Sequence, residues 1–136
     1  MCRLARISDV HDIDEPALTI AETVERTGVS AHTLRYYERV GLIDPVPRSA
    51  GGTRLYTPRS LGRIVFLARM RSTGMSIDDL RTYVGLIRDG QDTSPQRREL
   101  LEAHRRDVTS KIANLQDAVS MLDLKIDDYR IWEHAQ

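Results

Sequence analysis

The pattern of hydrophobic and polar positions divides the start of the chain into a polar arm and a helix. Residues 1–17 are polar and acidic and show no sustained periodicity, so we expect a flexible N-terminal arm. Thr19 and Glu22 then have the S/T-x-x-E spacing of a capping box, which predicts the start of a helix. The apolar residues expected on its inner face are Ile20, Ala21 and Val24.

A second short helix is expected after a tight turn. Gly28 ends the first helix, Ser30 can cap the second, and Gly41 can stop it near Val40. Two short helices joined by a Gly-containing turn are typical of a helix-turn-helix motif, which we place at residues 20–39.

The helical period gives the two adjacent tyrosines of the second helix different surroundings. Tyr37 lies with Leu34 on the inward side, where it can pack on the first helix. The outward side carries His32, Arg35, Tyr36 and Arg39. An aromatic ring among cations suits a surface that meets phosphates or base edges. Cation–π packing of Tyr36 on one of these arginines is the alternative interpretation.

Residues at about 46–57 predict a two-stranded wing. Gly51 and Gly52 lie between two short segments and are typical of a hairpin tip. By the period-two alternation of a strand, Arg54 and Tyr56 point to one side and Leu55 to the other. We therefore expect Arg54 and Tyr56 to stand on an exposed face of the wing.

Two further helices are expected before residue 90. Thr57 followed by Pro58 predicts the start of the first, Gly74 breaks it, and Ser76 caps the second. The core positions expected from the helical period are Leu61, Ile64, Val65 and Ala68 in the first helix and Leu80, Tyr83, Val84 and Ile87 in the second.

The last part of the chain predicts one long helix with a heptad seam, at residues 94–131. Apolar residues recur in two series with seven-residue spacing, as in a coiled coil. The seam residues are Leu101, Val108, Ile112, Leu115, Val119, Leu122 and Ile126. A small N-terminal module cannot cover so long a stripe, so a helix from a second chain is the economical cover. The alternative is that the stripe folds back on its own domain.

The distribution of charge favours nucleic acid as a partner, although the net charge of the 136-residue chain is zero. Between Ser30 and Arg71 eight arginines stand against two acidic residues, a formal excess of six positive charges. The planar fork of arginine suits phosphates and base edges better than lysine does. The N-terminal arm and the C-terminal third supply the compensating acids.

Other function classes find little support in the sequence. Cys2 is the sole cysteine, so we expect neither an intrachain disulfide nor a thiolate metal site, and we predict no cofactor. The four histidines are scattered and no nucleophile lies with a base, so an enzyme is not expected. Without a signal peptide or a long apolar run, we expect a cytoplasmic protein with no membrane partner.

Short motifs in these elements resemble those of the MerR family of bacterial transcription regulators. They are LRYYE at 34–38, GLI at 41–43, PR at 47–48, GTRLY at 52–56 and RSTGMS at 71–76. The resemblance covers about residues 18–90, and the helix that follows is similar to the family's dimerisation helix.

The resemblance implies a mostly α fold: a winged helix-turn-helix DNA-binding domain at residues 18–90, then a long dimerisation helix in an antiparallel coiled coil. It implies a homodimer on inverted repeats of double-stranded promoter DNA, which it bends and untwists so that RNA polymerase can engage both recognition elements. The DNA-binding positions carried over are His32, Thr33, Arg35, Tyr36 and Arg39 in the major groove and Arg54 and Tyr56 on the backbone.

The sequence departs from the sensing members of that family. It has no cysteine at residues 94–98, where metal sensors carry one, and no large C-terminal ligand domain, so the small-molecule effector stays unknown. Two alternative functions remain open. One is an architectural DNA-binding accessory protein without an activator role, and the other is a coiled-coil adaptor that binds protein.

Overall fold

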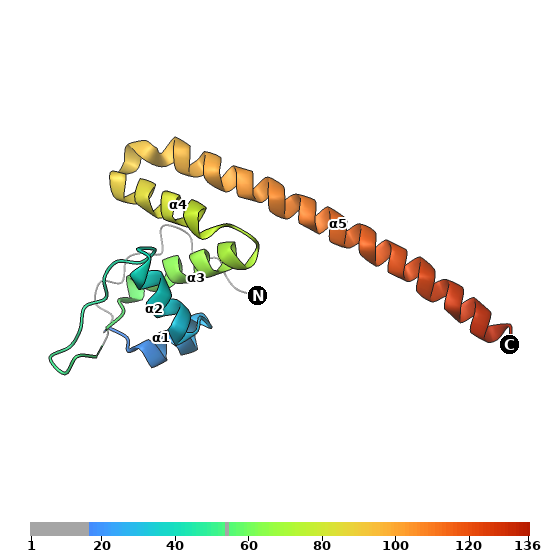
Figure 1. Cartoon of the computed structure of the whole chain (residues 1–136), viewed down its shortest axis with the longest axis horizontal. Helices are drawn as coiled ribbons and strands as arrows, with labels where there is room; N and C mark the ends of the chain where they lie inside the picture. Colours follow the sequence, from blue (N-terminus) through green and yellow to red (C-terminus); the bar gives the residue numbers. More distant parts are fainter. Residues whose placement is uncertain (1–16, 54) are drawn as a thin grey trace. The chain divides into compact units, whose positions relative to one another are not determined.

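The computed structural model describes residues 17–53 and 55–136, so Arg54 and nearly all of the predicted arm lie outside the described residues. The chain divides into two compact units, one ending at Gly90 and one beginning at Gln91. The described residues of the first unit form the helices α1 (Ile20–Thr27), α2 (Ala31–Arg39), α3 (Pro58–Ser72) and α4 (Ile77–Asp89) (Figure 1). The second holds a 3₁₀ helix at Gln91–Thr93 and the long helix α5 (Ser94–His134).

The first two helices begin and end at the predicted residues. The Thr19 hydroxyl accepts a hydrogen bond from the backbone N–H of Glu22 (3.2 Å), and the Glu22 carboxylate accepts one from the N–H of Thr19 (3.3 Å), which confirms the capping box. Gly28 closes α1 with a φ of 72°, a left-handed conformation that glycine adopts without steric cost. Ser30 caps α2 by accepting from the N–H of Thr33 (3.1 Å).

The second pair of helices is also confirmed. Pro58 stands at the start of α3, where its missing N–H costs no helical hydrogen bond. The Ser76 hydroxyl accepts from the N–H of Asp79 (3.0 Å) and so caps α4. The rings of Phe66 and Tyr83 lie 5.7 Å apart between their centroids and join the two helices.

A single apolar core holds the N-terminal unit together. Helix α1 packs on α2 and α3, and α3 packs on α4. Leu34 and Tyr37 of α2 are buried, which confirms the inward side predicted from the helical period. The other buried apolar side chains are Leu18, Val29, Leu42, Ile43, Tyr56, Ile64, Leu67, Met75, Leu80 and Val84.

Two predicted core positions are wrong. Ala21 is exposed, and Thr23 takes the buried position in α1 because its hydroxyl can donate to the carbonyl oxygen of Thr19 (2.9 Å). Val65 is 41% exposed, whereas Leu67 is fully buried. Leu67 lies three residues after the buried Ile64 and therefore shares its helix face, which Val65 does not.

The wing is a loop-like hairpin, with no regular strand among its described residues. The N–H of Ser49 donates to the carbonyl of Thr53, and the N–H of Leu55 donates to that of Pro47, both at 2.8 Å. Gly52 has a φ of 83° at the tip, as the predicted turn requires. Figure 1 shows the wing extending away from the four helices.

The predicted exposed position of Tyr56 is wrong, because its side chain is only 1% exposed. Tyr56 forms a two-way backbone bridge with Leu18, in which each N–H donates to the other residue's carbonyl at 2.7 Å. This bridge ties the end of the wing to the segment that enters α1. Alternation along the wing cannot reveal it, because the pairing partner lies outside the hairpin.

The predicted long helix is present as α5. It begins at Ser94–Pro95 and runs for 41 residues, which corresponds to about 60 Å at the helical rise. Leu101 and Val108 are half-buried, and the later seam residues are all at least 45% exposed. These exposed residues are Ile112, Leu115, Val119, Leu122 and Ile126.

Candidate nucleic-acid interface

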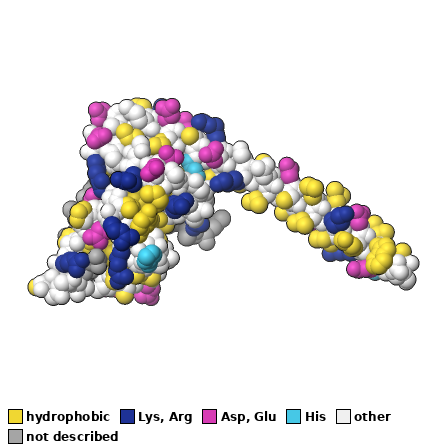
Figure 2. Space-filling view, in the orientation of Figure 1, with side chains coloured by type: hydrophobic (Ala, Val, Ile, Leu, Met, Phe, Trp, Pro, Cys, Tyr) yellow, Lys and Arg dark blue, Asp and Glu magenta, His cyan; other side chains and the backbone are white. Residues whose placement is uncertain are grey.

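Helix α2 presents a cationic face on the side opposite its core residues. His32, Arg35 and Arg39 are exposed, as predicted, and Tyr36 between them is half-buried. The face exists because Leu34 and Tyr37 fix the rotation of the helix: burying them turns these positions toward solvent. In Figure 2 Lys and Arg side chains gather on the visible face of the N-terminal unit.

Tyr36 packs against a neighbouring cation in the free protein. The guanidinium carbon of Arg39 lies 5.4 Å from the centroid of the Tyr36 ring, and the ring itself lies 6.3 Å from that of Tyr37. The cation–π contact predicted as an alternative is therefore present. It holds Arg39 and Tyr36 together on the outer face.

Thr33 belongs to the capped first turn of α2. Its hydroxyl accepts a hydrogen bond from the Ser30 hydroxyl at 2.9 Å, and its side chain is half-buried. The first turn of a helix also carries a partial positive charge that favours phosphate. Thr33 and the capped turn therefore suit a contact with a DNA phosphate better than a reading of base edges.

Tyr37 is the buried anchor of the interface helix. Burial raises the pKa of the Tyr37 hydroxyl above its ordinary value of about 10, the positive charge of Arg71 opposes this shift, and Tyr36 adds to it. The side chain is therefore neutral at physiological pH. Because the neutral Tyr37 ring is buried in the core, it fixes the rotation of α2 and therefore the position of the outer face.

The wing lies next to α2 through a direct hydrogen bond. A carboxylate oxygen of Glu38 accepts from the backbone N–H of Val46 at 3.2 Å. On the wing, the exposed Arg48 donates to the carbonyl of Gly52 at 3.4 Å. Arg48 is an exposed cation of the wing that the sequence-based set of site residues omits, whereas Tyr56 of that set is buried.

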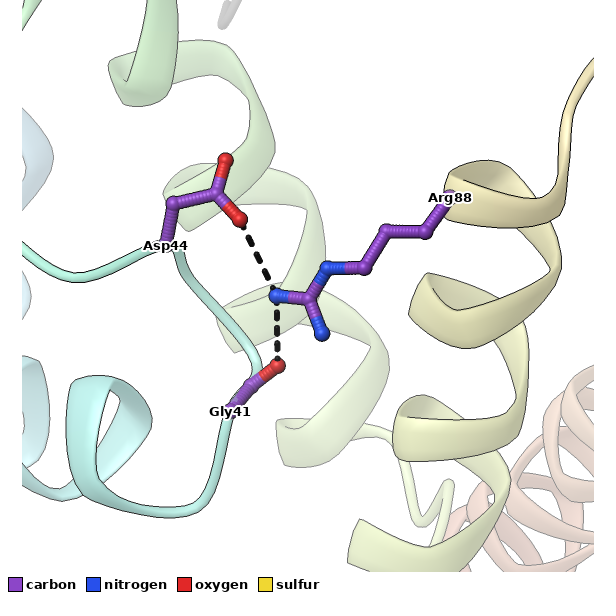
Figure 3. A network of polar contacts seen from close by, with 3 residues as sticks. All are labelled: Gly41, Asp44 and Arg88. Atoms are coloured by element: carbon purple, nitrogen blue, oxygen red, sulfur yellow. Dashed lines mark hydrogen bonds and ion pairs between the residues drawn. The ribbon is translucent and has the colours of Figure 1, made fainter.

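A second link joins the loop after α2 to helix α4. Nη2 of Arg88 donates to the carbonyl oxygen of Gly41 at 3.0 Å and to a carboxylate oxygen of Asp44 at 3.1 Å (Figure 3). These residues are 47 and 44 positions from Arg88 in the sequence. No local pattern could have predicted this link, because nothing in the spacing brings α4 to that loop.

Other kinds of site find no support in the described part of the chain. Within residues 17–53 and 55–136 no three His, Cys, Asp or Glu side chains come together as metal ligands would. Among the same residues, no helix has the length and apolar character that crossing a bilayer requires.

Two family descriptions match the sequence of this chain. The description "MerR HTH family regulatory protein" matches residues 18–85, and "MerR, DNA binding" matches residues 61–124. The chain belongs to the MerR family. It is a transcription regulator of the helix-turn-helix class. A long C-terminal helix follows the helix-turn-helix domain, as we predicted from the sequence.

Relatives and solved structures of the MerR family are similar over most of the chain. A helix-turn-helix transcriptional regulator of Haemophilus influenzae is 33% identical over 112 residues, which cover 82% of this chain and 83% of the relative. A crystal structure of a MerR family transcriptional regulator from Listeria monocytogenes has a TM-score of 0.76 and 44% identity, and covers 82% of this chain and 85% of that chain.

One similar MerR structure contains DNA. It is the crystal structure of HiNmlR, described as a MerR family regulator lacking the sensor domain, bound to promoter DNA. It is 32% identical to this chain with a TM-score of 0.74, and the match covers 84% of this chain and 90% of that chain.

Proposed function

We propose that the protein acts as a homodimer on inverted repeats in promoter DNA, and that it bends and untwists this DNA. The observation that carries the proposal is the exposed cationic face of α2, held outward by the buried Leu34 and Tyr37. The HiNmlR structure supports it, because that related regulator is bound to promoter DNA. RNA polymerase at the deformed promoter is the expected partner, and no effector is assigned.

The residues of the interface take different roles in this proposal. Arg35 is exposed in the middle of the face and reads a base edge, since paired guanidinium contacts to guanine are the commonest specific contact in the major groove. Thr33 and Tyr36 contact phosphate and fix the register of the helix. Arg48 and Arg54 contact backbone from the wing. Tyr56 has no direct role, because it is buried.

The second chain of the proposed dimer covers the seam of α5. The exposed seam residues from Ile112 to Ile126 recur at heptad spacing on one face, and Figure 2 shows hydrophobic side chains repeated along this helix. Apolar surface of this extent on a single helix marks an interface. An antiparallel partner helix would give each dimer two copies of the α2 face, which matches a DNA site with two half-sites.

The proposal is tested by titrating the protein onto an inverted repeat that it enriches from random-sequence DNA. The double variant Arg35→Ala, Tyr36→Ala should bind this site about 10- to 100-fold more weakly and approach the affinity for unrelated DNA. Arg54→Ala should weaken binding to both DNAs alike. Arg130→Ala, an exposed arginine near the end of α5, is the matched control and should bind like the wild type.

Salt and transcription separate the proposal from its alternatives. The affinity for DNA should fall steeply as the salt concentration rises. Binding displaces counterions from the DNA phosphates, and added salt opposes this displacement. A protein-binding adaptor would show no salt-dependent DNA affinity. An architectural protein would bend a long-spacer promoter without changing the amount of transcript in a reaction with purified RNA polymerase. Equal binding of the α2 double variant and the wild type to the enriched site would refute the assignment of the face.

A further inference from the structure

The loop that connects α2 to the wing is held at both of its ends. At its far end, Glu38 of α2 accepts a hydrogen bond from the N–H of Val46. At its near end, Arg88 reaches from the last turn of α4 and holds Gly41 and Asp44 through one guanidinium nitrogen (Figure 3). The direction in which the wing leaves α2 therefore depends on contacts from two different helices.

Arg88 makes its contact across an open cleft. The cleft has a volume of about 520 Å³ and is lined by Val40, Gly41, Asp78, Arg81, Thr82 and Arg88. Gly85 lies on α4 between Arg81 and Arg88, and a Cβ added to it would meet no atom within 4 Å. Between Gly41 and Asp44 the buried Leu42 and Ile43 anchor the loop in the core. Arg88 adds a restraint on the outer side of the loop, through a side chain at the edge of this cleft.

We propose that Arg88 is a positioning residue for DNA recognition: it acts as a strut that, together with the buried Leu42 and Ile43, sets the angle between the α2 face and the wing. The inference rests on the proposed function, because the angle matters only if both surfaces contact one DNA molecule. Arg88 itself contacts no DNA in this scheme. Asp44 is its counterpart, one of the two acidic residues that stand among eight arginines between Ser30 and Arg71.

The exposure of the strut separates its effect on recognition from its effect on stability. The side chains of Arg88 and Asp44 are 45% and 73% exposed, and ion pairs this exposed contribute little to folding. So weak a pair can still have a geometric role, because binding to two surfaces at once depends on their relative position. The variants should therefore stay folded while their DNA affinity changes.

Arg81→Ala is a matched control for Arg88→Ala. Both residues line the same cleft on the same helix, seven positions apart, and both substitutions remove one positive charge. If only the loss of charge mattered, the two variants would lose the same amount of DNA affinity. The strut predicts that Arg88→Ala raises the Kd for the enriched inverted repeat about two- to fivefold more than Arg81→Ala does, the range that a surface ion pair allows.

For the variant Asp44→Ala, the strut and a simple charge effect predict changes in DNA affinity of opposite sign. Removing an acidic residue from a basic surface should tighten DNA binding if charge alone matters. The strut predicts weaker binding instead, by about twofold, because Arg88 keeps only its contact with Gly41. In the double variant Arg88→Ala, Asp44→Ala, loss of Asp44 should cause no further weakening, since the strut is already absent.

The measurements are fluorescence anisotropy titrations of wild type and variants at one salt concentration, with circular dichroism melts as the control for folding. Equal Kd values for Arg88→Ala and Arg81→Ala, or tighter binding by Asp44→Ala, would overturn the strut while the proposed function stands. If the wild type binds no DNA, the proposed function fails first and the strut's role fails with it. If Arg88→Ala lowers the melting temperature, the Asp44→Ala variant still tests the strut, because the two explanations predict opposite changes in its Kd.

Discussion

Tyr36 and Tyr37 are neighbours in the sequence with different surroundings in the structure. Tyr37 is 3% exposed and packs in the core, whereas Tyr36 lies half-exposed under the guanidinium of Arg39. The helical period predicted this division, because it depends only on which face of α2 is apolar. The contact between Tyr36 and Arg39 means that DNA would meet the two side chains as a single unit.

Tyr37 leads to a prediction for alkaline solution. Burial raises the pKa of its hydroxyl in the folded state, so the folded protein holds this proton more tightly than the unfolded chain does. The resulting stabilisation is fully present below the unfolded pKa of about 10 and is lost as pH rises through the higher folded pKa.

The free energy of unfolding, measured with urea, should therefore fall above about pH 10 in the wild type, and should fall less steeply in Tyr37→Phe. Tyr36→Phe keeps Tyr37 in place and removes only the smallest of the three influences on its pKa, so this control should retain most of the steeper fall. A Tyr37→Phe variant with the same slope as the wild type would show that this hydroxyl does not titrate differently on folding.

At the scale of the elements, the sequence predicted most of the fold because its helix boundaries are local. Ser30 and Ser76 cap α2 and α4 by bonds within their own first turns, and Gly28 ends α1 through its own φ angle. Core faces followed from the helical period, except where the hydroxyl of Thr23 found a partner within α1.

Features that depend on distant segments escaped prediction. Tyr56 is buried because its backbone pairs with Leu18, 38 residues earlier, rather than with the wing alone. The strut from Arg88 to Asp44 likewise joins segments that no periodicity relates. Of the candidate site, the α2 face was predictable and the ion pair between Arg88 and Asp44 was not.

Replacing a glycine by alanine tests the end of α1 and the extent of α4, because the same substitution should have opposite effects at the two positions. Gly85 lies inside α4 with space for a Cβ, so Gly85→Ala should raise the free energy of unfolding by about 0.4–1 kcal/mol. Gly28 has a φ of 72°, so Gly28→Ala should lower it by about 1 kcal/mol. Urea unfolding at one fixed protein concentration measures both, and two effects of the same sign would contradict these helix boundaries.

At the scale of the whole molecule, the two units supply complementary parts of one proposed function. The N-terminal unit carries one cationic α2 face, and α5 carries an apolar seam whose central members Leu115, Val119 and Leu122 are more than half exposed. In the proposed function one face reads one half-site, and a dimer joined through the seam would present two. Recognition of a single half-site should therefore be weak.

Two duplexes titrated in the same salt test this requirement: the enriched inverted repeat, and the same duplex with one half-site scrambled. Because each wrong base pair costs about 1–3 kcal/mol, we expect the scrambled half-site to raise the Kd of the wild-type protein at least tenfold. Equal affinity for the two duplexes would contradict the proposal that a pair of α2 faces reads an inverted repeat.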